Sequence, residues 1–538
     1  MGAAEFFDEN RRKTVAIIYG RVYNTKECAD ASYQAGRRAD ALTTYLLNGV
    51  YDMVFSSLVF LYAFFPLSLL AYCLVPGKKG KNAVLLIFSL IFYAWGEPKY
   101  VLLLMFMAFV AWLCALGVEK AGSKGGKRAW VAVSSIVDIA LIGYFKYAGL
   151  IFSVFGDVPE FIRQIVLPIG ISFYTFQLLT YVVDVYRQEA SAQKNYFNVL
   201  LYAALFHQCI AGPIVRYKTI EEDLFSEKKR KPRVAMGVSR FCGGLAKKVL
   251  LANACGALAD SLILSDAVLA NTEKFAENLQ TLQNLPVLAA WLGVLAYGLQ
   301  IYLDFSAYSD MAIGMGRMLG LRYLENFDYP YISRSVTEFW RRWHISLGTF
   351  FRDYVYIPLG GNRGSVPRVV FNTFVVWALT GLWHGGSWNF VLWGLWFFVF
   401  LMIERAFLKK ALYKVPVLSN LYLLLVVMLG WVIFRFTDIR LGWAVAKSLF
   451  GANGNALTGF AAETALKSNM FLLAVSCFAC LPVMHRLKEK LEKYGRKHKP
   501  FGVMLNLLLY SVIPVVLLLL STAALVGDSY NPFIYFQF

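Results

Sequence analysis

Long apolar runs separated by short polar segments occupy the chain from about residue 53 to its C-terminal end. Many runs approach the roughly 20 residues that an α-helix needs to cross the hydrocarbon core of a bilayer. They include 56–75, 100–118, 129–151, 286–302, 378–403, 418–434 and 501–526. Shorter runs, such as 83–95, could pair with a neighbour. The pattern predicts an all-α polytopic membrane protein with roughly 11 transmembrane helices plus interfacial or re-entrant helices.

Composition and charge agree with this pattern. Hydrophobic residues make up 58% of the 538 residues and charged residues 16%, whereas soluble domains average about half and a quarter. The net charge of +19 could suggest a nucleic-acid partner, but the basic residues gather between apolar runs, at 78–81, 124–128, 228–233, 409–410 and 486–499. Such loops are typical of the cytoplasmic face, where anionic headgroups attract them. We therefore expect a lipid bilayer and no nucleic acid.

Residues 1–52 are polar and contain no run of spanning length. One interpretation is a polar cytosolic or amphipathic leader. The other is that translation begins at Met53. The basic loop at 77–81 favours the second, because it places Met53 outside the cytoplasm and a leader with arginine pairs would have to cross the membrane. The membrane-embedded body is predicted to cover 53–538.

Polar residues interrupt several apolar segments. Asp304 and Asp310 lie in the long run 290–319, and Gly212-Pro213 break the short segment 206–216. Carboxylates at membrane depth face protein or water, and irregular backbone is tolerated where it lines a cavity. We expect Asp304 and Asp310 to be structural, with direct substrate contact as the alternative. Residues 322–368 are amphipathic and predict one or two interfacial helices.

Two of the five histidines, His344 and His384, follow tryptophans within the membrane body. A side chain that titrates near neutral pH is costly beside lipid, so it usually faces a partner, water or a substrate. A neutral imidazole could accept the proton of a hydroxyl that attacks an acyl carbonyl. We predict His384 as the catalytic base and His344 as a second catalytic or positioning residue. A histidine hydrogen-bonded inside a helix bundle is the structural alternative for each.

The surroundings of His384 strengthen this hypothesis. Glycines at 381, 385 and 386 are expected to leave room for a substrate, and Trp383 and Trp388 to wall the pocket against water. His207 and Lys146 are interpreted as a core or interface histidine and an interface lysine. Motifs of serine hydrolases, P-loop proteins, zinc proteases and dinucleotide-binding enzymes are absent, and no metal site is predicted.

Three arginines near His344 could bind phosphates. Arg341, Arg342 and Arg352 could hold the phosphates of a carrier such as coenzyme A, because guanidinium groups bind phosphate in bidentate fashion. Snorkelling of each arginine to lipid phosphates is the alternative. No bound cofactor is predicted; the acyl donor would be acetyl-CoA or another acyl thioester.

The sequence resembles a known family, the membrane-bound O-acyltransferases. Within that family it is most similar to the bacterial alginate O-acetylation branch, which is related to the teichoic-acid D-alanylation branch. The resemblance covers about 53–538. The motifs that carry it are IYLDFSAYSDMAIG (301–314), Asn326-Phe327, FWRRWHISL (339–347), FRDYVYIPLGGN (351–362), TGLWHGGSWN (380–389), 168–176 and AGPIVRY (211–217). His207 departs from it, since a proline is expected there.

The resemblance implies a helical bundle around a central funnel in the bacterial cytoplasmic (inner) membrane. It implies that His384 is the catalytic histidine and His344 its second histidine. It also implies acyl transfer from a cytoplasmic thioester toward an extracytoplasmic polysaccharide, directly or through an SGNH-type acetyltransferase or polysaccharide biosynthesis complex. Within the motifs, the predicted substrate- or donor-binding residues are Trp343, Arg341, Arg342, Arg352, Asp304, Ser309, Asp310, Gly360, Gly361, Asn362, Trp383 and Asn389.

The sequence is compatible with three alternatives. D-alanyl transfer to teichoic acid would use the same fold. A transporter or channel would use the intramembrane carboxylates and histidines as an ion path, although no inverted repeat is apparent. A scaffold that only docks a partner would need neither histidine.

Overall fold

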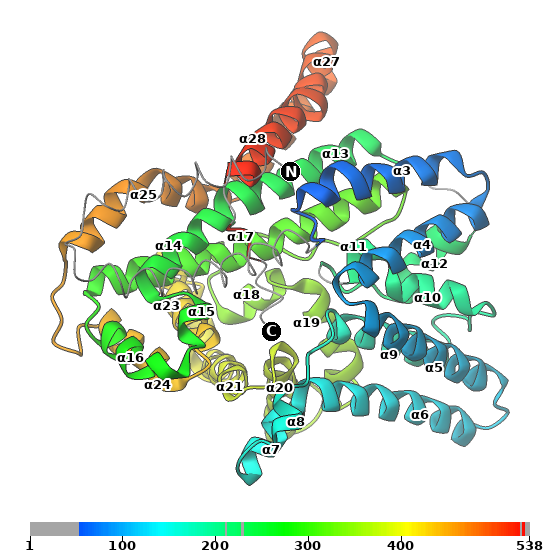
Figure 1. The fold of residues 1–538 in the computed structure, drawn as a ribbon, viewed down its shortest axis with the longest axis horizontal. Helices are drawn as coiled ribbons and strands as arrows, with labels where there is room; N and C mark the ends of the chain where they lie inside the picture. Colours follow the sequence, from blue (N-terminus) through cyan, green and yellow to red (C-terminus); the bar gives the residue numbers. More distant parts are fainter. Residues whose placement is uncertain (1–52, 210–211, 227–230, 528–529, 533–538) are drawn as a thin grey trace, which may run out of the picture. The chain divides into compact units, whose positions relative to one another are not determined.

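Helices form all the regular secondary structure in the residues that the structure describes, which are 53–209, 212–226, 231–527 and 530–532 of a computed structural model (Figure 1). The interpretations offered for residues 1–52 lie outside these residues. The all-α prediction is confirmed.

The helices up to residue 225 begin with η1 and end with α12. They are η1 (Phe60–Phe64), α3 (Phe65–Leu74), α4 (Lys78–Gly96), η2 (Pro98–Tyr100), α5 (Val101–Lys120), α6 (Lys124–Ile142), η3 (Gly143–Tyr147), α7 (Ala148–Phe155), α8 (Glu160–Arg163), α9 (Ile171–Tyr186), α10 (Tyr196–Ala204), α11 (Phe206–Cys209) and α12 (Tyr217–Phe225).

The middle of the chain surrounds one long helix and then forms short segments. These elements are α13 (Val234–Ala246), η4 (Lys247–Ala252), α14 (Asn253–Ile263), α15 (Asp266–Leu269), η5 (Thr272–Lys274), α16 (Phe275–Gln283), α17 (Val287–Leu319), η6 (Pro330–Ile332), α18 (Val336–Arg342), α19 (Ile345–Phe351) and η7 (Arg352–Tyr356).

The last part of the chain contains mostly long helices. They are α20 (Val366–His384), α21 (Trp388–Ile403), η8 (Glu404–Leu408), α22 (Lys409–Leu412), α23 (Pro416–Arg435), α24 (Ile439–Leu449), α25 (Phe460–Ala479), α26 (Val483–Lys497), α27 (Lys499–Leu507), η9 (Leu508–Val512) and α28 (Ile513–Gly527).

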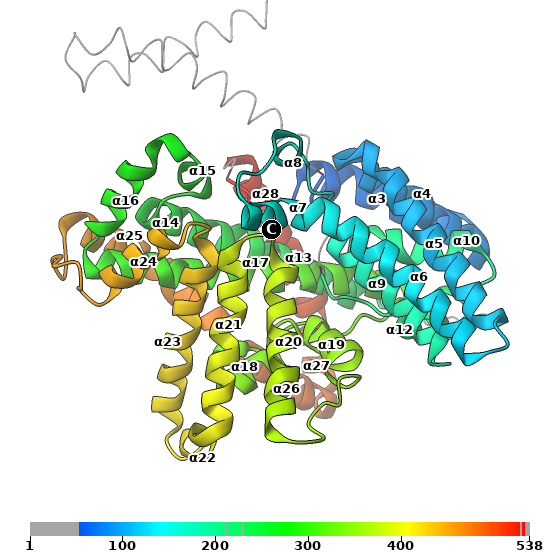
Figure 2. The same cartoon turned by 90° about the horizontal axis from the view of Figure 1, so that it is seen from below.

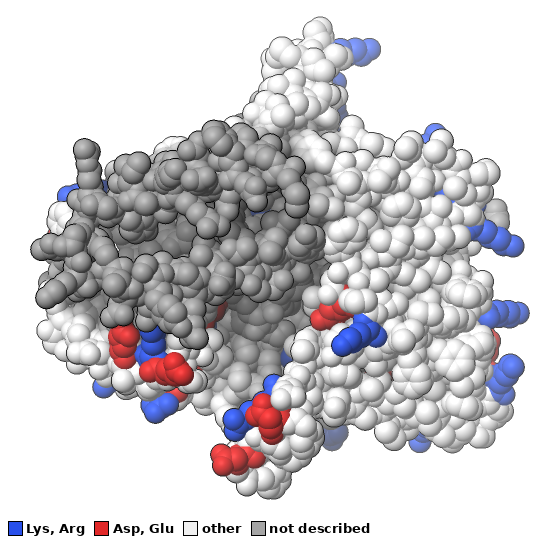
Figure 3. All heavy atoms as spheres, in the orientation of Figure 1, with Lys and Arg blue, Asp and Glu red and all other residues white. Residues whose placement is uncertain are grey.

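The described residues contain 8 helices long and apolar enough to cross a membrane, or up to 9 if the bent pair α25–α26 is one span. The predicted count of about 11 is therefore not confirmed. Two apolar helices are too short to be counted as spans. Helix α9 has 16 residues, and the helix Phe60–Leu74 is also short. The surface agrees with a membrane body: Figure 3 shows few charges over α3 to α6, where apolar side chains such as Leu102 are exposed.

Helix α17 is the most enclosed of the candidate spans, and it crosses the middle of the unit beside α13 and α14 (Figure 1). Its carboxylates have cationic partners on the neighbouring segment. Asp304 pairs with Lys248 at 2.9 Å, and both side chains are almost fully buried. Asp310 pairs with Arg240 and Lys247, each at 2.6 Å. The expectation that these carboxylates face protein is confirmed, and pairing offsets part of the cost of burying charge.

The predicted single run 378–403 is wrong as one helix. The structure breaks it at 385–387 into α20 and α21, which run side by side (Figure 2). Glycines permit this close contact: a Cβ on Gly381 would lie 2.4 Å from the Phe390 carbonyl oxygen, and one on Gly394 would lie 2.4 Å from that of Trp377. Small residues let membrane helices approach closely.

Gly394→Ala should therefore lower the thermal unfolding temperature of the detergent-solubilised protein, because a methyl group there meets backbone rather than a movable side chain. We expect a cost of about 1–3 kcal/mol. Gly243→Ala is the matched control, since a Cβ on that helical glycine meets nothing within 4 Å. Equal melting temperatures for the two variants, measured by size-exclusion chromatography after heating, would contradict this account of the hairpin.

Candidate active site

His384 is the last residue of α20, and aromatic rings surround it. The centroid of its imidazole lies 4.8 Å from those of Trp383 and Trp393 and 5.2 Å from that of Phe434. The residue is 7% exposed, and its Nε2 is buried without a hydrogen-bond partner in the described part of the chain. A substrate therefore reaches Nε2 only when one of these side chains moves.

The glycines beside His384 do not open a space for substrate, contrary to the sequence interpretation. A Cβ on Gly385 would lie 2.1 Å from the Phe390 ring, and one on Gly386 would lie 2.1 Å from the Lys146 carbonyl oxygen. The space beside both glycines is therefore filled by other parts of the protein. Trp388 also differs from expectation, because it is 54% exposed. Trp393, one turn and a half further along α21, supplies the ring that was expected from Trp388.

The ring of His344 also contacts that of Trp383. Its ring centroid is 5.5 Å from that of Trp383 and 4.7 Å from that of Phe305 on α17. It caps α19 in the left-handed backbone region, with φ of 43°. This conformation is uncommon for a residue other than glycine and persists only where the surroundings impose it. The structure thus brings the rings of both predicted histidines into contact with the same tryptophan ring.

A hydrogen-bond network determines the tautomer of His344. The Asn326 Oδ1 accepts from the Ser346 backbone N–H at 3.1 Å, so this atom is an oxygen. The His344 Nδ1 lies 3.2 Å from the same oxygen and must therefore carry its proton. The Nε2 is left as the unprotonated nitrogen, and it has no partner among the described residues. Asn326 in turn donates to Ser309 at 3.3 Å, which places Ser309 behind the network.

Burial also keeps His344 neutral. The residue is 1% exposed, and desolvation lowers its pKa to about 3. The bare Nε2 of this neutral imidazole can accept a hydrogen bond at physiological pH, but a pKa this low makes it a weak base. Asn326 and Ser346 take part in the network that orients this neutral ring. Both lie within the motifs that carry the family resemblance, but neither was predicted as a site residue.

Lys146 was interpreted as an interface lysine, and the structure corrects this. Its ammonium donates to the backbone carbonyl of Trp383 and, at 3.1 Å, to the Ser172 hydroxyl. The neighbouring Tyr147 hydroxyl donates to the Leu382 carbonyl at 2.7 Å. The last carbonyls of a helix have no partner within the helix. Segment η3 therefore caps the end of α20 that carries His384.

Two further predicted residues lie in the walls of this site. Trp343 is buried, and its ring packs 5.0 Å from that of Trp431. Asn389 donates to the Phe434 carbonyl at 3.0 Å, which ties α21 to α23 and holds Phe434 against His384. For the two carboxylates of α17, the ion pairs described above are structural partners. Direct substrate contact by any of these residues stays a prediction.

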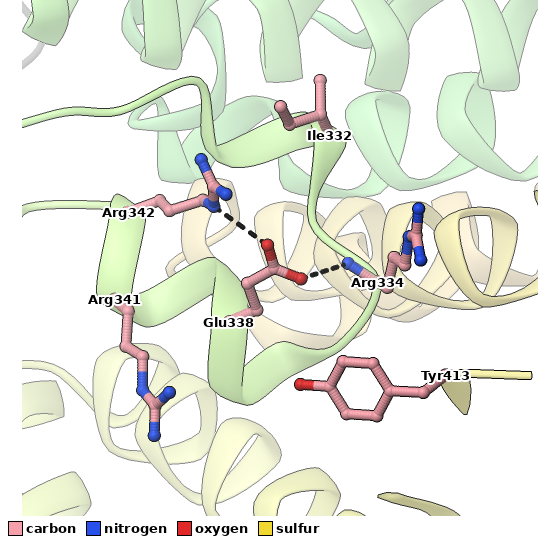
Figure 4. Close-up of a pocket in the computed structure, with 6 residues that line it drawn as sticks. All are labelled: Ile332, Arg334, Glu338, Arg341, Arg342 and Tyr413. Atoms are coloured by element: carbon pink, nitrogen blue, oxygen red, sulfur yellow. Dashed lines mark hydrogen bonds and ion pairs between the residues drawn. The ribbon is translucent and has the colours of Figure 1, made fainter. Parts of the chain in front are cut away.

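Arg341 and Arg342 lie at a pocket of about 420 Å³ beside α18 (Figure 4). Arg342 is committed to Glu338 and Asp328, each at 3.0 Å. Arg341 is exposed and has no ion-pair partner among the described residues. The Tyr413 hydroxyl points into the pocket (Figure 4). The lining residues are Ile332, Arg334, Glu338, Arg341, Arg342 and Tyr413.

The remaining predicted residues follow α19. Arg352 is 60% exposed and pairs with Asp353 at 2.6 Å. Gly360 and Gly361 have φ of 109° and 59°, which a tight turn requires and which glycine adopts without strain. Asn362 accepts from the Tyr356 hydroxyl at 2.8 Å. These contacts shape a turn before α20, and a role in binding donor or substrate stays a prediction.

A polytopic helical body with two histidines buried against one tryptophan ring is the architecture of a membrane protein with an enclosed polar site. The chain belongs to the MBOAT, membrane-bound O-acyltransferase, family, which matches residues 90–442. It is therefore an acyltransferase.

The relatives of this chain within the family include proteins named for O-acetylation. The chain is 36% identical to a probable alginate O-acetylase, AlgI, of Azotobacter vinelandii over 518 residues, which are 90% of this chain and 100% of the relative. It is 40% identical to the protein of the same name from Pseudomonas aeruginosa over 407 residues, 74% and 75% of the two chains. A peptidoglycan O-acetyltransferase of Helicobacter pylori is 30% identical over 455 residues, 77% and 83% of the chains.

The low pKa of His344 predicts an acid-dependent loss of stability. The unfolded chain takes up a proton below pH about 6.5, whereas the folded protein does so only near pH 3. Stability therefore falls as the pH drops between these values, by about 2 kcal/mol from this residue at pH 5. His344→Gln should make the melting temperature of the detergent-solubilised protein fall less between pH 7 and pH 5. His485→Gln, whose parent side chain is 58% exposed, is the control. Parallel slopes for wild type and His344→Gln would refute the assignment.

Proposed function

We propose that this acyltransferase moves an acetyl group from a cytoplasmic thioester toward an extracytoplasmic polysaccharide, in the bacterial inner membrane. The observation that carries the proposal is the pair of buried histidines whose rings contact that of Trp383, each with an Nε2 that no described residue engages. The O-acetylase names of the relatives support acetyl as the acyl group and a glycan as the acceptor.

In the proposed reaction, His384 acts as the base. Its Nε2 takes the proton of the acceptor hydroxyl while that oxygen attacks the thioester carbonyl carbon. The C–O bond forms, the C–S bond breaks, and the proton passes from His384 to the departing sulfur, so that an ester and a thiol result. His344, held neutral by burial and oriented by Asn326, contacts the same tryptophan ring and assists the reaction. The aromatic walls exclude water that would otherwise hydrolyse the thioester.

The pocket beside α18 is the proposed contact for the donor's phosphates. Basic residues gather in the segment between α21 and α23, beside Tyr413, and by the positive-inside rule this end faces the cytoplasm. Arg334 and Arg341 are among the residues that line the pocket. Acetyl-CoA, which carries several phosphates, fits this chemistry. On the opposite side, an SGNH-type acetyltransferase or a polysaccharide biosynthesis complex would complete transfer to the glycan.

Replacement of the base tests the proposal directly. His384→Ala, in cells that lack their own copy, should lower the rate of ester-linked acetate appearing in extracellular polysaccharide by about 10²–10⁴-fold, the usual contribution of a general base. Cells are fed radiolabelled acetate, so the result does not depend on the identity of the donor.

The control for this experiment is His485→Ala, because that side chain is 58% exposed. Membrane levels of both variants are measured by immunoblot. If His384→Ala acetylates at the wild-type rate, the proposed mechanism is wrong. Flux of ions through proteoliposomes without any acyl donor would instead favour a transporter.

Removal of the two pocket arginines that form no ion pair with a described residue should weaken donor binding without changing the chemical step. The double variant Arg334→Ala/Arg341→Ala should raise the acetyl-CoA concentration that gives half-maximal thiol release about 10²- to 10⁴-fold, since hydrogen bonds to charged groups contribute about 1.5–3 kcal/mol each. The maximal rate should not change. The assay uses the full chain in lipid nanodiscs. Arg440→Ala is the matched control, because Arg440 is an exposed arginine paired with Asp438 elsewhere in the fold. An unchanged half-saturation concentration would show that the donor does not bind in this pocket.

A further inference from the structure

The ammonium group of Lys146 reaches the candidate active site from a distant part of the sequence. It belongs to η3, a π-helical turn between α6 and α7, and such turns are frequent at functional sites. The hydrogen bond from its Nζ to the Trp383 carbonyl spans 237 residues of sequence. Because Trp383 directly precedes His384, this bond attaches the cation to the helix end that carries the predicted base.

Two acceptors engage this ammonium within the described chain, the Trp383 carbonyl and the Ser172 hydroxyl. An ammonium group has three N–H donors, so one remains. No carboxylate among the described residues pairs with Lys146. A cation without a carboxylate partner at membrane depth is costly and marks a functional position by default.

Capping of α20 does not by itself require a charge. Tyr147 supplies the same kind of bond to the preceding carbonyl, that of Leu382, through a neutral hydroxyl. A second neutral donor would complete the cap without the cost of burying an ammonium group. The positive charge therefore needs another explanation, and the acyl-transfer reaction offers one.

We propose that Lys146 is a further catalytic residue, whose third N–H donates to the oxyanion formed when the acceptor hydroxyl attacks the thioester carbonyl. This inference rests on the proposed function, with His384 as base. In the step, the C–O bond forms and the carbonyl electron pair moves onto oxygen, where the ammonium stabilises it. The electron pair then returns as the C–S bond breaks, and the sulfur takes the proton from His384. Lys146 itself neither gains nor loses a proton.

A cation fixed in this way stabilises the transition state more than the ground state. Two of its N–H bonds hold it in place before reaction, so no reorganisation is needed when the charge develops. Removal of one such preorganised donor typically lowers the catalytic rate about 10²–10³-fold. The enclosed surroundings strengthen the interaction, because the local dielectric constant is lower than in water.

The test compares four variants in the metabolic-labelling assay used for His384. Lys146→Met removes both donor and charge and should lower the rate of acetate incorporation about 10²–10³-fold. Lys146→Gln keeps amide donors for the cap but no charge, and it should be nearly as slow. Lys146→Arg keeps charge and donors and should recover a large part of the rate. Tyr147→Phe, which removes only a neutral cap bond, should remain within about fivefold of wild type.

The outcomes separate this inference from the function on which it rests. An inactive His384→Ala together with a fully active Lys146→Met overturns the role of Lys146 alone, whereas an active His384→Ala overturns the proposed function. If Lys146→Gln matches wild type, or if Tyr147→Phe is as slow as Lys146→Met, Lys146 is only a cap. Each variant's melting temperature in detergent is measured beside its activity, and a variant that does not reach the membrane is replaced in the comparison by Ser172→Ala. That variant removes one of the two bonds that hold the ammonium and should slow the reaction without removing the charge.

Discussion

The contact between α20 and α21 is the constraint on which the candidate site depends. The backbones of these helices approach at Gly381 and Gly394, so closely that a methyl group on either glycine would meet a carbonyl oxygen at 2.4 Å. This approach brings Trp393 of α21 against His384 at the end of α20. It also positions Asn389 to bind the Phe434 carbonyl of α23. The positions of two aromatic neighbours of His384, Trp393 and Phe434, thus depend on one close helix contact.

The all-α membrane body could be predicted from the sequence, because the length of an apolar run limits what it can form in a bilayer. The boundaries of its helices could not. The run 378–403 is continuous in hydropathy, yet Gly385 and Gly386 pack against Phe390 and Lys146 and turn the chain there. Hydropathy reports the environment of a residue and not the direction of the backbone, so a hairpin with apolar residues on both sides of its turn resembles one span.

The same limit applies to the site. His344 and His384 could be predicted because histidine is rare in apolar surroundings and both follow tryptophan. Their partners could not be predicted from local pattern, since Asn326 lies 18 residues from His344 and Lys146 lies 237 residues from Trp383. Lys146 resembles an interface lysine in sequence because it sits among aromatic residues near the end of an apolar run. Only the fold shows that its ammonium binds the end of α20 and not the lipid headgroups.

The two histidines and the lysine differ in what holds them, and this difference suggests a division of roles. Asn326 fixes the tautomer of His344, and burial keeps that ring neutral, so its Nε2 is a ready acceptor but a weak one. His384 is packed between aromatic rings, and no described residue hydrogen-bonds its Nε2. Lys146 is held by two hydrogen bonds and brings a charge that no described carboxylate neutralises. A base must change its charge, whereas an oxyanion donor must keep it. The surroundings therefore suit His384 to the first role, Lys146 to the second and His344 to orientation.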